Sequence, residues 1–203
     1  MSEPSIRRER INPANRAQPS ALVHGPSGTT KPLYLEERFS TTLTANGLDI
    51  PFFGFLDRVD RRDGGIVILD YKTGTIKKPA AKFWEGDLWE RMSKHDPAAP
   101  DESLLPDLAK ALGSVQLPAY LHLYRNDRDE IPWDAALVEL KNKGEEKPLF
   151  INKQDEEARN EIIVDQIPEL LGFIVGHMIG AETFEGIPDT HCQWCSFRGN
   201  CGQ

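Results

Sequence analysis

The first half of the chain alternates apolar and polar residues, and this pattern predicts a run of β-strands. Strands are expected over 33–43, where Leu35, Phe39 and Leu43 lie among polar neighbours, and over the apolar segments 48–60 and 66–73. Asn46-Gly47 and Asp63-Gly64 separate these segments, and both dipeptides are strong signals for two-residue hairpin turns. The pattern therefore predicts two successive hairpins.

The second half is predicted as helices interleaved with two short strands. Pro118 should bend the helix expected over 108–124 or mark its first turn. Asp155 should cap the long helix expected from 156 onward. The expected elements are a short helix over 83–92, a helix over 108–124, strands over 135–140 and 149–151, and a helix from 156 to about 183. This order predicts an α/β fold with a mixed central β-sheet.

The 203 residues divide into three regions. Residues 1–30 are rich in Arg, Pro, Ser, Asn and Gly without an apolar period, so a flexible N-terminal arm is expected. Residues 31–190 carry the periodic segments and should form the core, whereas residues 191–203 contain all the cysteines. No apolar run approaches the length that spans a bilayer, and the start lacks a signal-peptide core. A cytoplasmic location without membrane contact is therefore expected.

The net charge of −8 argues against a protein coated in positive charge for binding nucleic acid. A local basic groove is still compatible with it, because four lysines lie close together in sequence. These are Lys72, Lys77, Lys78 and Lys82. Composition leaves two alternatives open for them, a nucleic-acid groove and an ordinary solvated surface.

The segment GFLDRVDRRDGGIVILDYKTG, residues 54–74, places charged residues inside two apolar strands. With Asp63-Gly64 in the turn, counting outward along both strands sets Asp57 opposite Asp70. Alternation then puts Asp57, Asp70 and Lys72 on one face of the sheet, with the carboxylates roughly 5 Å apart at their Cβ atoms. A turn placed one residue later would shift the register and separate the two acids.

Two carboxylates this close repel each other, so a positive group should lie between them. Lys72 alone would make a structural ion-pair cluster. A divalent cation is the other candidate, because carboxylate oxygens suit Mg²⁺ and Mn²⁺. Asp60 points to the opposite face, where it should pair with Arg58 or with an arginine of the turn.

The strings GFLDRVD and ILDYKTG resemble motifs of the PD-(D/E)xK nuclease superfamily, in particular of its RecB-type exonuclease branch. QLPAY, in which Gln116 and Tyr120 lie one helical turn apart, is similar to the QxxxY motif of that branch. The resemblance covers about residues 33–201 and implies a restriction-endonuclease-like core. It also implies that Gln116 and Tyr120 contact the DNA backbone or support the site, an ordinary helix face being the alternative.

The same resemblance implies roles for the residues of the hairpin. Asp57, Asp70 and the backbone carbonyl of Tyr71 would ligate Mg²⁺ or Mn²⁺. Lys72 would orient or activate the attacking water and stabilise the charge that develops on the phosphate. A structural ion pair is the alternative for Lys72.

Three cysteines lie in HCQWCSFRGNC near the end of the chain: Cys192, Cys195 and Cys201. An odd, clustered set in a chain without a secretion signal favours a metal site over disulfides. The string resembles the C-terminal part of the iron–sulfur staple of AddB-like helicase–nucleases and of the exonucleases of CRISPR adaptation. It thereby implies a [4Fe–4S] cluster, with a Zn²⁺ site or three reduced thiols as the alternatives.

Two features of this branch are missing from the sequence. No cysteine upstream of the core supplies the fourth cluster ligand, and no amphipathic first helix carries a metal-binding histidine. His24, Glu36 and Glu37 are the candidates to replace that histidine, with solvated surface as the alternative for the glutamates. Together the absences suggest the C-terminal part of a larger protein or a reduced variant of the domain.

These features predict a Mg²⁺- or Mn²⁺-dependent deoxyribonuclease, an exonuclease that hydrolyses DNA in repair or recombination beside a helicase partner. One alternative is a catalytically impaired DNA-binding or scaffold module that keeps the nuclease fold. A nuclease of RNA is the other. Trp84, Trp89 and Trp133 could stack on unpaired bases, but packing inside the protein is the expectation for them.

Overall fold

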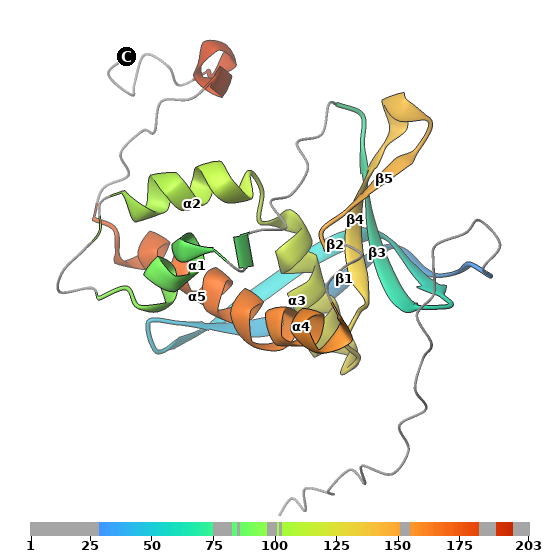
Figure 1. Ribbon diagram of the computed structural model, residues 1–203, viewed down its shortest axis with the longest axis horizontal. Helices are drawn as coiled ribbons and strands as arrows, with labels where there is room; N and C mark the ends of the chain where they lie inside the picture. The colour runs from blue at the N-terminus through green and yellow to red at the C-terminus, as the bar shows by residue number, and fades with distance from the viewer. Residues whose placement is uncertain are drawn as a thin grey trace, which may run out of the picture.

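Figure 1 shows the computed structural model of the chain as a ribbon. It describes residues 29–74, 83–84, 86–96, 101, 103–150, 155–182 and 190–196. The predicted N-terminal arm, apart from its last two residues, lies outside the described residues. The same holds for His24, Lys77, Lys78, Lys82 and Cys201. The basic groove therefore stays a prediction.

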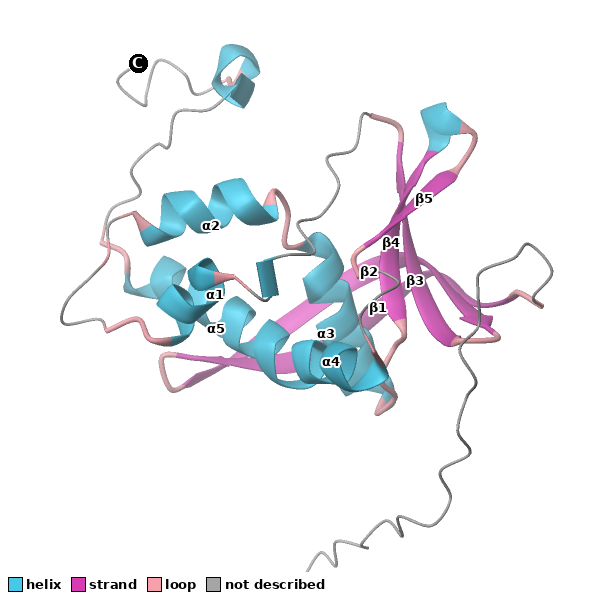
Figure 2. Ribbon diagram, viewed as in Figure 1, coloured by secondary structure: helices cyan, strands magenta, loops and turns pink. Residues whose placement is uncertain are grey.

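Five strands form one mixed sheet in the order β1-β2-β3-β4-β5. Antiparallel ladders join β1 to β2, β2 to β3 and β4 to β5, whereas β3 and β4 run parallel. The strands are β1 (Lys31–Ala45), β2 (Leu48–Arg62), β3 (Gly65–Lys72), β4 (Asp134–Glu139) and β5 (Glu145–Pro148). Helices pack along this sheet (Figure 2), so the predicted α/β class with a mixed sheet is confirmed.

Both predicted hairpins are present. Asn46-Gly47 makes the first turn with left-handed backbone φ angles of 49° and 72°. In the second hairpin Arg62 pairs with Gly65, which is the register counted from a turn at Asp63-Gly64. The alternative turn, one residue later, is wrong.

The helix predicted over 108–124 is wrong, because two separate helices occupy this part of the chain. Gly113 ends the first with a φ of 63°, a conformation that favours glycine. Pro118 lies in the first turn of the second, where a missing N–H removes no helical hydrogen bond. The helices are α1 (Asp87–Ser93), α2 (Leu104–Leu112), α3 (Gln116–Arg128), α4 (Glu156–Glu161) and α5 (Ile167–Gly180).

The C-terminal helix is continuous, because α4 runs through the π-helical turn η3 (Ile162–Gln166) into α5. Asp155 caps its start as predicted and accepts a hydrogen bond from the N–H of Ala158 at 2.8 Å. Length and composition alone would allow this helix to cross a membrane. Its inner face instead packs against α3 and β1 and buries Ile162, Ile163, Ile167, Leu170 and Leu171.

The strand predicted over 149–151 is wrong, since β5 lies earlier in the chain. After β4, a 3₁₀ turn, η2 (Leu140–Asn142), and the left-handed pair Lys143-Gly144 reverse the chain within a few residues. β5 therefore begins beside the end of β4, with Glu145 opposite Glu139. The sequence pattern missed this strand because its residues are mostly charged rather than apolar.

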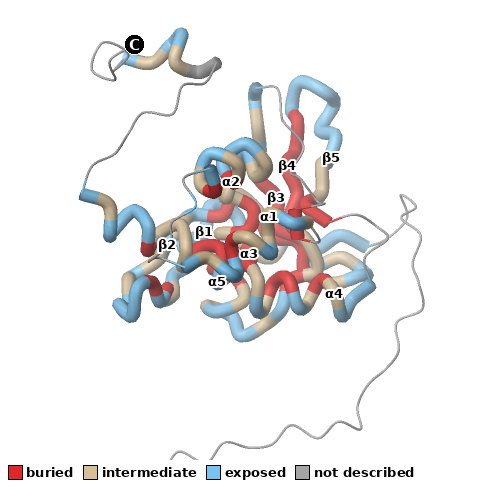
Figure 3. The backbone as a smooth tube through the Cα atoms, turned by 60° about the vertical axis from the view of Figure 1, so that its left-hand side comes forward, coloured by how far each residue is buried: buried red, intermediate tan, exposed pale blue. Residues whose placement is uncertain are grey.

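Buried stretches gather where the sheet meets the helices (Figure 3). The main core joins apolar residues of the strands and helices, among them Phe39, Ile68 and Leu121. A smaller cluster on the other face of β3 and β4 packs against Trp133. Trp84 is buried in the main core and Trp89 packs against it, which confirms that these tryptophans pack inside the protein.

Candidate active site

The end of β3 meets the first turn of α3, and four polar side chains come together there. Asp70 and Lys72 lie two residues apart on β3, so alternation points them to the same face of the sheet. Gln116 and Tyr120 lie one turn apart on α3 and share one helix face. Tertiary packing thus joins two motifs whose first members, Asp70 and Gln116, are 46 positions apart in the chain.

Gln116 is the hub of this cluster. Its Nε2 donates hydrogen bonds to Oδ1 of Asp70 at 2.8 Å and to the Tyr120 hydroxyl at 2.7 Å. Its Oε1 accepts a hydrogen bond from Nζ of Lys72 at 2.7 Å. One neutral amide therefore holds both the carboxylate of Asp70 and the ammonium group of Lys72 at fixed positions.

Asp70 is almost completely buried, with 2% of its surface exposed. Its Oδ1 accepts from Gln116 and, at 3.4 Å, from the Tyr120 hydroxyl. Its Oδ2 forms an ion pair with Nζ of Lys72 at 2.6 Å but has no partner in hydrogen-bond geometry. A buried carboxylate oxygen with only a charge contact is suited to binding a cation.

Asp57 approaches the same cluster from β2. Its Oδ2 accepts a hydrogen bond from the backbone N–H of Tyr71 at 2.9 Å, between the two motif residues of β3. Burial raises the pKa of Tyr120, and the negative charges of Asp70 and Asp57 raise it further. Both acids therefore act electrostatically on Tyr120, as expected if their carboxylates lie on one face of the sheet.

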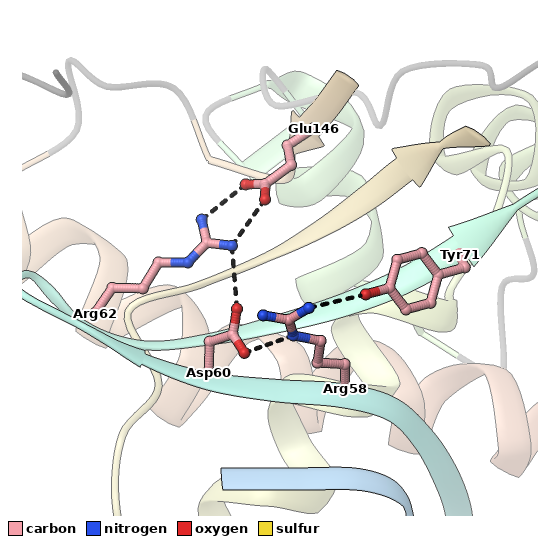
Figure 4. A network of polar contacts seen from close by, with 5 residues as sticks. All are labelled: Arg58, Asp60, Arg62, Tyr71 and Glu146. Carbon is pink, nitrogen blue, oxygen red and sulfur yellow. Dashed lines mark hydrogen bonds and ion pairs between the residues drawn. The ribbon is translucent and has the colours of Figure 1, made fainter. Parts of the chain in front are cut away.

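A network of ion pairs lies on the opposite face of the sheet (Figure 4). Asp60 is fully buried and contacts Nε of Arg58 at 2.6 Å and Nη2 of Arg62 at 3.4 Å. Arg62 also pairs with both carboxylate oxygens of Glu146, and Arg58 donates to the Tyr71 hydroxyl. The predicted pairing of Asp60 is confirmed. The network ties β2, β3 and β5 together behind the cluster.

Comparison with known families agrees with this geometry. A family model described as the PD-(D/E)XK nuclease superfamily matches residues 7–202. The chain belongs to the PD-(D/E)XK nuclease superfamily. No match was found among curated proteins. Membership of this superfamily indicates a nuclease, with DNA as the implied substrate and a divalent metal ion as the usual cofactor.

The carboxylates fit the divalent cation that members of this superfamily usually use. Asp57 and Asp70 lie on the neighbouring strands β2 and β3 and both act electrostatically on Tyr120, and Mg²⁺ commonly takes one or two carboxylates and keeps several waters. Oδ2 of Asp70, which has an ion pair with Lys72 but no hydrogen bond, supplies a suitable ligand atom. Within the described part of the chain, no group of three or more His, Cys, Asp or Glu side chains forms a candidate metal site. The backbone carbonyl of Tyr71 is not one of these groups, and it stays a predicted ligand.

The other predicted ligands of this superfamily domain are described only in part. The N–H of Cys195 donates to the carbonyl of Cys192 at 3.3 Å, at the end of the 3₁₀ turn η4 (Thr190–Trp194). Figures 1 and 2 show this turn apart from the sheet and helices, and Cys201 lies outside the described residues, so the staple stays a prediction. Glu36 and Glu37 are exposed on β1, in agreement with the solvated alternative.

A second pair of an acid and a lysine borders the cluster and was not predicted. Nζ of Lys147 lies 2.7 Å from Oε2 of Glu139. Glu139 ends β4 and lies beside Lys72 in the parallel ladder. Sequence reasoning missed this pair, and also Glu146, because it placed the partner strand of β4 too late in the chain.

Proposed function

We propose that this chain is a Mg²⁺- or Mn²⁺-dependent deoxyribonuclease of the RecB-type branch, which hydrolyses DNA phosphodiester bonds as an exonuclease. The observation that supports this most is the cluster in which Gln116 holds both Asp70 and Lys72. These are the two charged residues of the DxK motif, and Asp57 reaches the same place. Hydrolysis needs an activated water and compensation for the negative charge that develops on the phosphate, and the cluster can supply both.

Asp57, Asp70 and the Tyr71 carbonyl are the proposed metal ligands. A divalent cation bound there would lower the pKa of a water and offset the developing negative charge. Lys72 supplies a positive charge of its own, 2.6 Å from Asp70, and its N–H groups can orient a water toward the phosphate. The lysine is a catalytic residue in this proposal.

Gln116 and Tyr120 are proposed as positioning residues. The amide of Gln116 fixes the Lys72 ammonium from one side, and the Tyr120 hydroxyl accepts the remaining N–H of that amide. Their alternative role, contact with the DNA backbone, predicts a different result on substitution. A positioning residue changes the rate constant for cleavage, whereas a backbone contact changes the affinity for DNA.

The proposal is tested with a panel of substrates in Mg²⁺, in Mn²⁺ and in EDTA. End-labelled linear single-stranded and double-stranded DNA, closed circular DNA and RNA of the same sequence are incubated with the full chain. Metal-dependent loss of linear DNA, with circles left intact, is the expected result. Cleavage of circles would replace the exonuclease assignment with an endonuclease, and cleavage of RNA alone would overturn the choice of substrate.

A DNA-binding scaffold is the second candidate, and one observation favours it. Lys72 forms an ion pair with Asp70 and a hydrogen bond with Gln116, so the charge of the buried Asp70 already has a partner within the protein. A chain that binds DNA with the affinity of a nuclease but cleaves none of the panel would be this scaffold.

We further propose that the nuclease serves DNA repair or recombination with a helicase, either as a partner or as part of a larger chain. The cysteines 192, 195 and 201 would hold a [4Fe–4S] cluster, with Zn²⁺ as the alternative. Anaerobically purified protein should then show visible iron–thiolate absorbance that Cys195→Ser removes. Colourless protein that contains zinc would reject the iron–sulfur assignment.

A further inference from the structure

The active-site face of the sheet continues from β3 across β4 to β5. Asp70 lies opposite Leu137 in the β3–β4 ladder, and Leu137 lies opposite Lys147 in the β4–β5 ladder. Lys72 lies opposite Glu139 in the same way. Because paired residues share a face, one row of side chains leads from Asp70 to Lys147 over two strand spacings, roughly 10 Å.

Glu139 and Lys147 form a close ion pair at the end of this row. Nζ of Lys147 lies 2.7 Å from Oε2 of Glu139, whose side chain is 10% exposed. The hydrogen bond to Glu139 raises the pKa of Lys147, so the ammonium stays charged near neutral pH. The lysine side chain is 22% exposed, which leaves it accessible to a ligand.

The Glu139–Lys147 pair lies beside the edge of the sheet where a ligand is expected to bind. β3 and β4 are the parallel strands of the sheet, and both Lys72 and Glu139 end their strands. Ligands of α/β sheets bind beyond the carboxyl ends of parallel strands. Glu139 holds the ammonium group of Lys147 beside this edge. The ammonium can therefore bind a negatively charged group of a ligand that extends away from Asp70.

We propose that Lys147 binds a backbone phosphate of the DNA strand next to the phosphate that is cleaved, and that Glu139 positions the lysine for this contact. The inference rests on the proposed nuclease function. It adds a subsite on β5 that selects a continuous nucleic-acid strand over a lone phosphate ester. A cation at a fixed distance from the cleavage centre also sets where the strand enters the site.

The salt dependence of DNA binding tests this subsite. Binding of a fluorescent single-stranded oligonucleotide to the full chain is measured in EDTA, which prevents cleavage, over a range of NaCl concentrations. Loss of one phosphate contact lowers the slope of log Kd against log salt by about 0.7 for single strands. Lys147→Gln should show this reduction and Lys147→Arg should not.

Two further variants separate the subsite from general effects of charge and folding. Lys94→Gln removes one lysine from the exposed Glu90 pair on α1 and should leave the slope unchanged. The double variant Glu139→Gln with Lys147→Gln keeps the net charge and a pair that can hydrogen-bond, so it preserves the fold around the pair. It should still show the reduced slope.

Cleavage kinetics separate failure of the inference from failure of the proposed function. If wild type cleaves DNA, Lys147→Gln should raise KM several-fold with kcat within about twofold, the signature of lost uniform binding. Wild-type cleavage with no change of slope or KM in Lys147→Gln would overturn the subsite alone. Absence of cleavage, with the slope still reduced by Lys147→Gln, would overturn the proposed function but retain the phosphate contact.

Discussion

At the scale of single residues, the cluster at β3 and α3 assigns unequal importance to its two helical members. Gln116 contacts Asp70 at 2.8 Å and also holds Lys72, whereas the Tyr120 hydroxyl is 3.4 Å from Asp70. Tyr120 acts mainly through its hydrogen bond with Gln116. Substitutions of the two residues should therefore lower kcat to different extents.

Gln116→Ala should lower kcat about 10- to 100-fold, because groups that orient catalytic ligands have effects of this size. Tyr120→Phe should lower kcat less, since Gln116 still reaches both Asp70 and Lys72. Neither variant should change the Kd for DNA measured in EDTA. Steady-state kinetics and anisotropy titration check these expectations, and a larger loss of affinity than of kcat would make both residues DNA contacts.

The sequence predicted the acids of the site better than their contacts. Counting from the Asp63-Gly64 turn gave the observed pairing of β2 with β3 as far as Arg58 opposite Leu69, one step before Asp57 and Asp70, because a hairpin register follows from its turn. The hydrogen bonds of Gln116 could not be predicted, because they depend on how α3 packs over β3. No local pattern in a sequence specifies that packing.

At the scale of elements, buried polar groups hold the sheet and α3 in place. Substitutions of these groups should therefore change the free energy of unfolding. Asp60 is the clearest case, since it is fully buried between two arginines on β2. Its removal would leave both guanidinium groups without their shared acid.

Asp60→Ala should reduce the free energy of unfolding by about 3 kcal/mol, the size expected when one partner of a buried ion pair is lost. Urea denaturation followed by circular dichroism measures this change. Asp49→Ala is the matched control on the same strand, because Asp49 is exposed and its loss should cost no more than about 0.5 kcal/mol. Equal losses in the two variants would contradict the role of the network.

His122 makes the stability of α3 depend on pH. Burial and the charge of Arg125 lower the pKa of His122 to about 4, and Nε2 of the ring has no hydrogen-bond partner. The unfolded chain, with an ordinary histidine pKa of about 6.5, binds this proton more readily than the folded chain. Stability should therefore fall as the pH drops from about 6.5 to about 4 and be unaffected by this residue above that range.

His122→Phe tests this dependence and keeps a ring against Phe52. Between pH 7 and pH 4.5 the variant should lose about 2 kcal/mol less unfolding free energy than wild type. The comparison uses the difference between the two pH values, so a constant change in stability does not affect it. Parallel pH profiles for the two proteins would show that His122 is protonated equally in both states.

Among the elements, the strands and their turns were predictable where the pattern was strong. The hairpins of β1 to β3 follow from alternation and two turn dipeptides. The break between α2 and α3 was not predicted, because a helical period continues through Gly113. β5 was not predicted either, since four charged or proline residues become a strand only beside β4.

At the scale of the whole molecule, the fold brings two distant parts of the chain to one place. The N-terminal hairpins supply the acids and the lysine, and α3 supplies the residues that hold them. The ion pairs behind the sheet join β2 to β5, and the Glu139–Lys147 pair joins β4 to β5. The proposed catalysis and DNA contact, like the stability of the fold, therefore depend on one sheet, and the family match over residues 7–202 covers all of it.

The most direct test of the central claim is the single-turnover rate of cleavage of linear single-stranded DNA in Mg²⁺ by wild type, Asp70→Asn and Asp63→Asn. Asp70→Asn keeps the shape of the buried side chain but removes the charge that the metal and Lys72 need. Asp63→Asn makes the same chemical change in the exposed turn, where Asn-Gly is an equally good hairpin signal.

Asp70→Asn should cleave at least about 100-fold more slowly, since loss of one electrostatic contributor at a reaction centre costs this much or more. Asp63→Asn should keep the wild-type rate, and thermal unfolding should show that both variants fold. Metal-dependent cleavage by Asp70→Asn at the wild-type rate would contradict the account, because the reaction would then take place elsewhere.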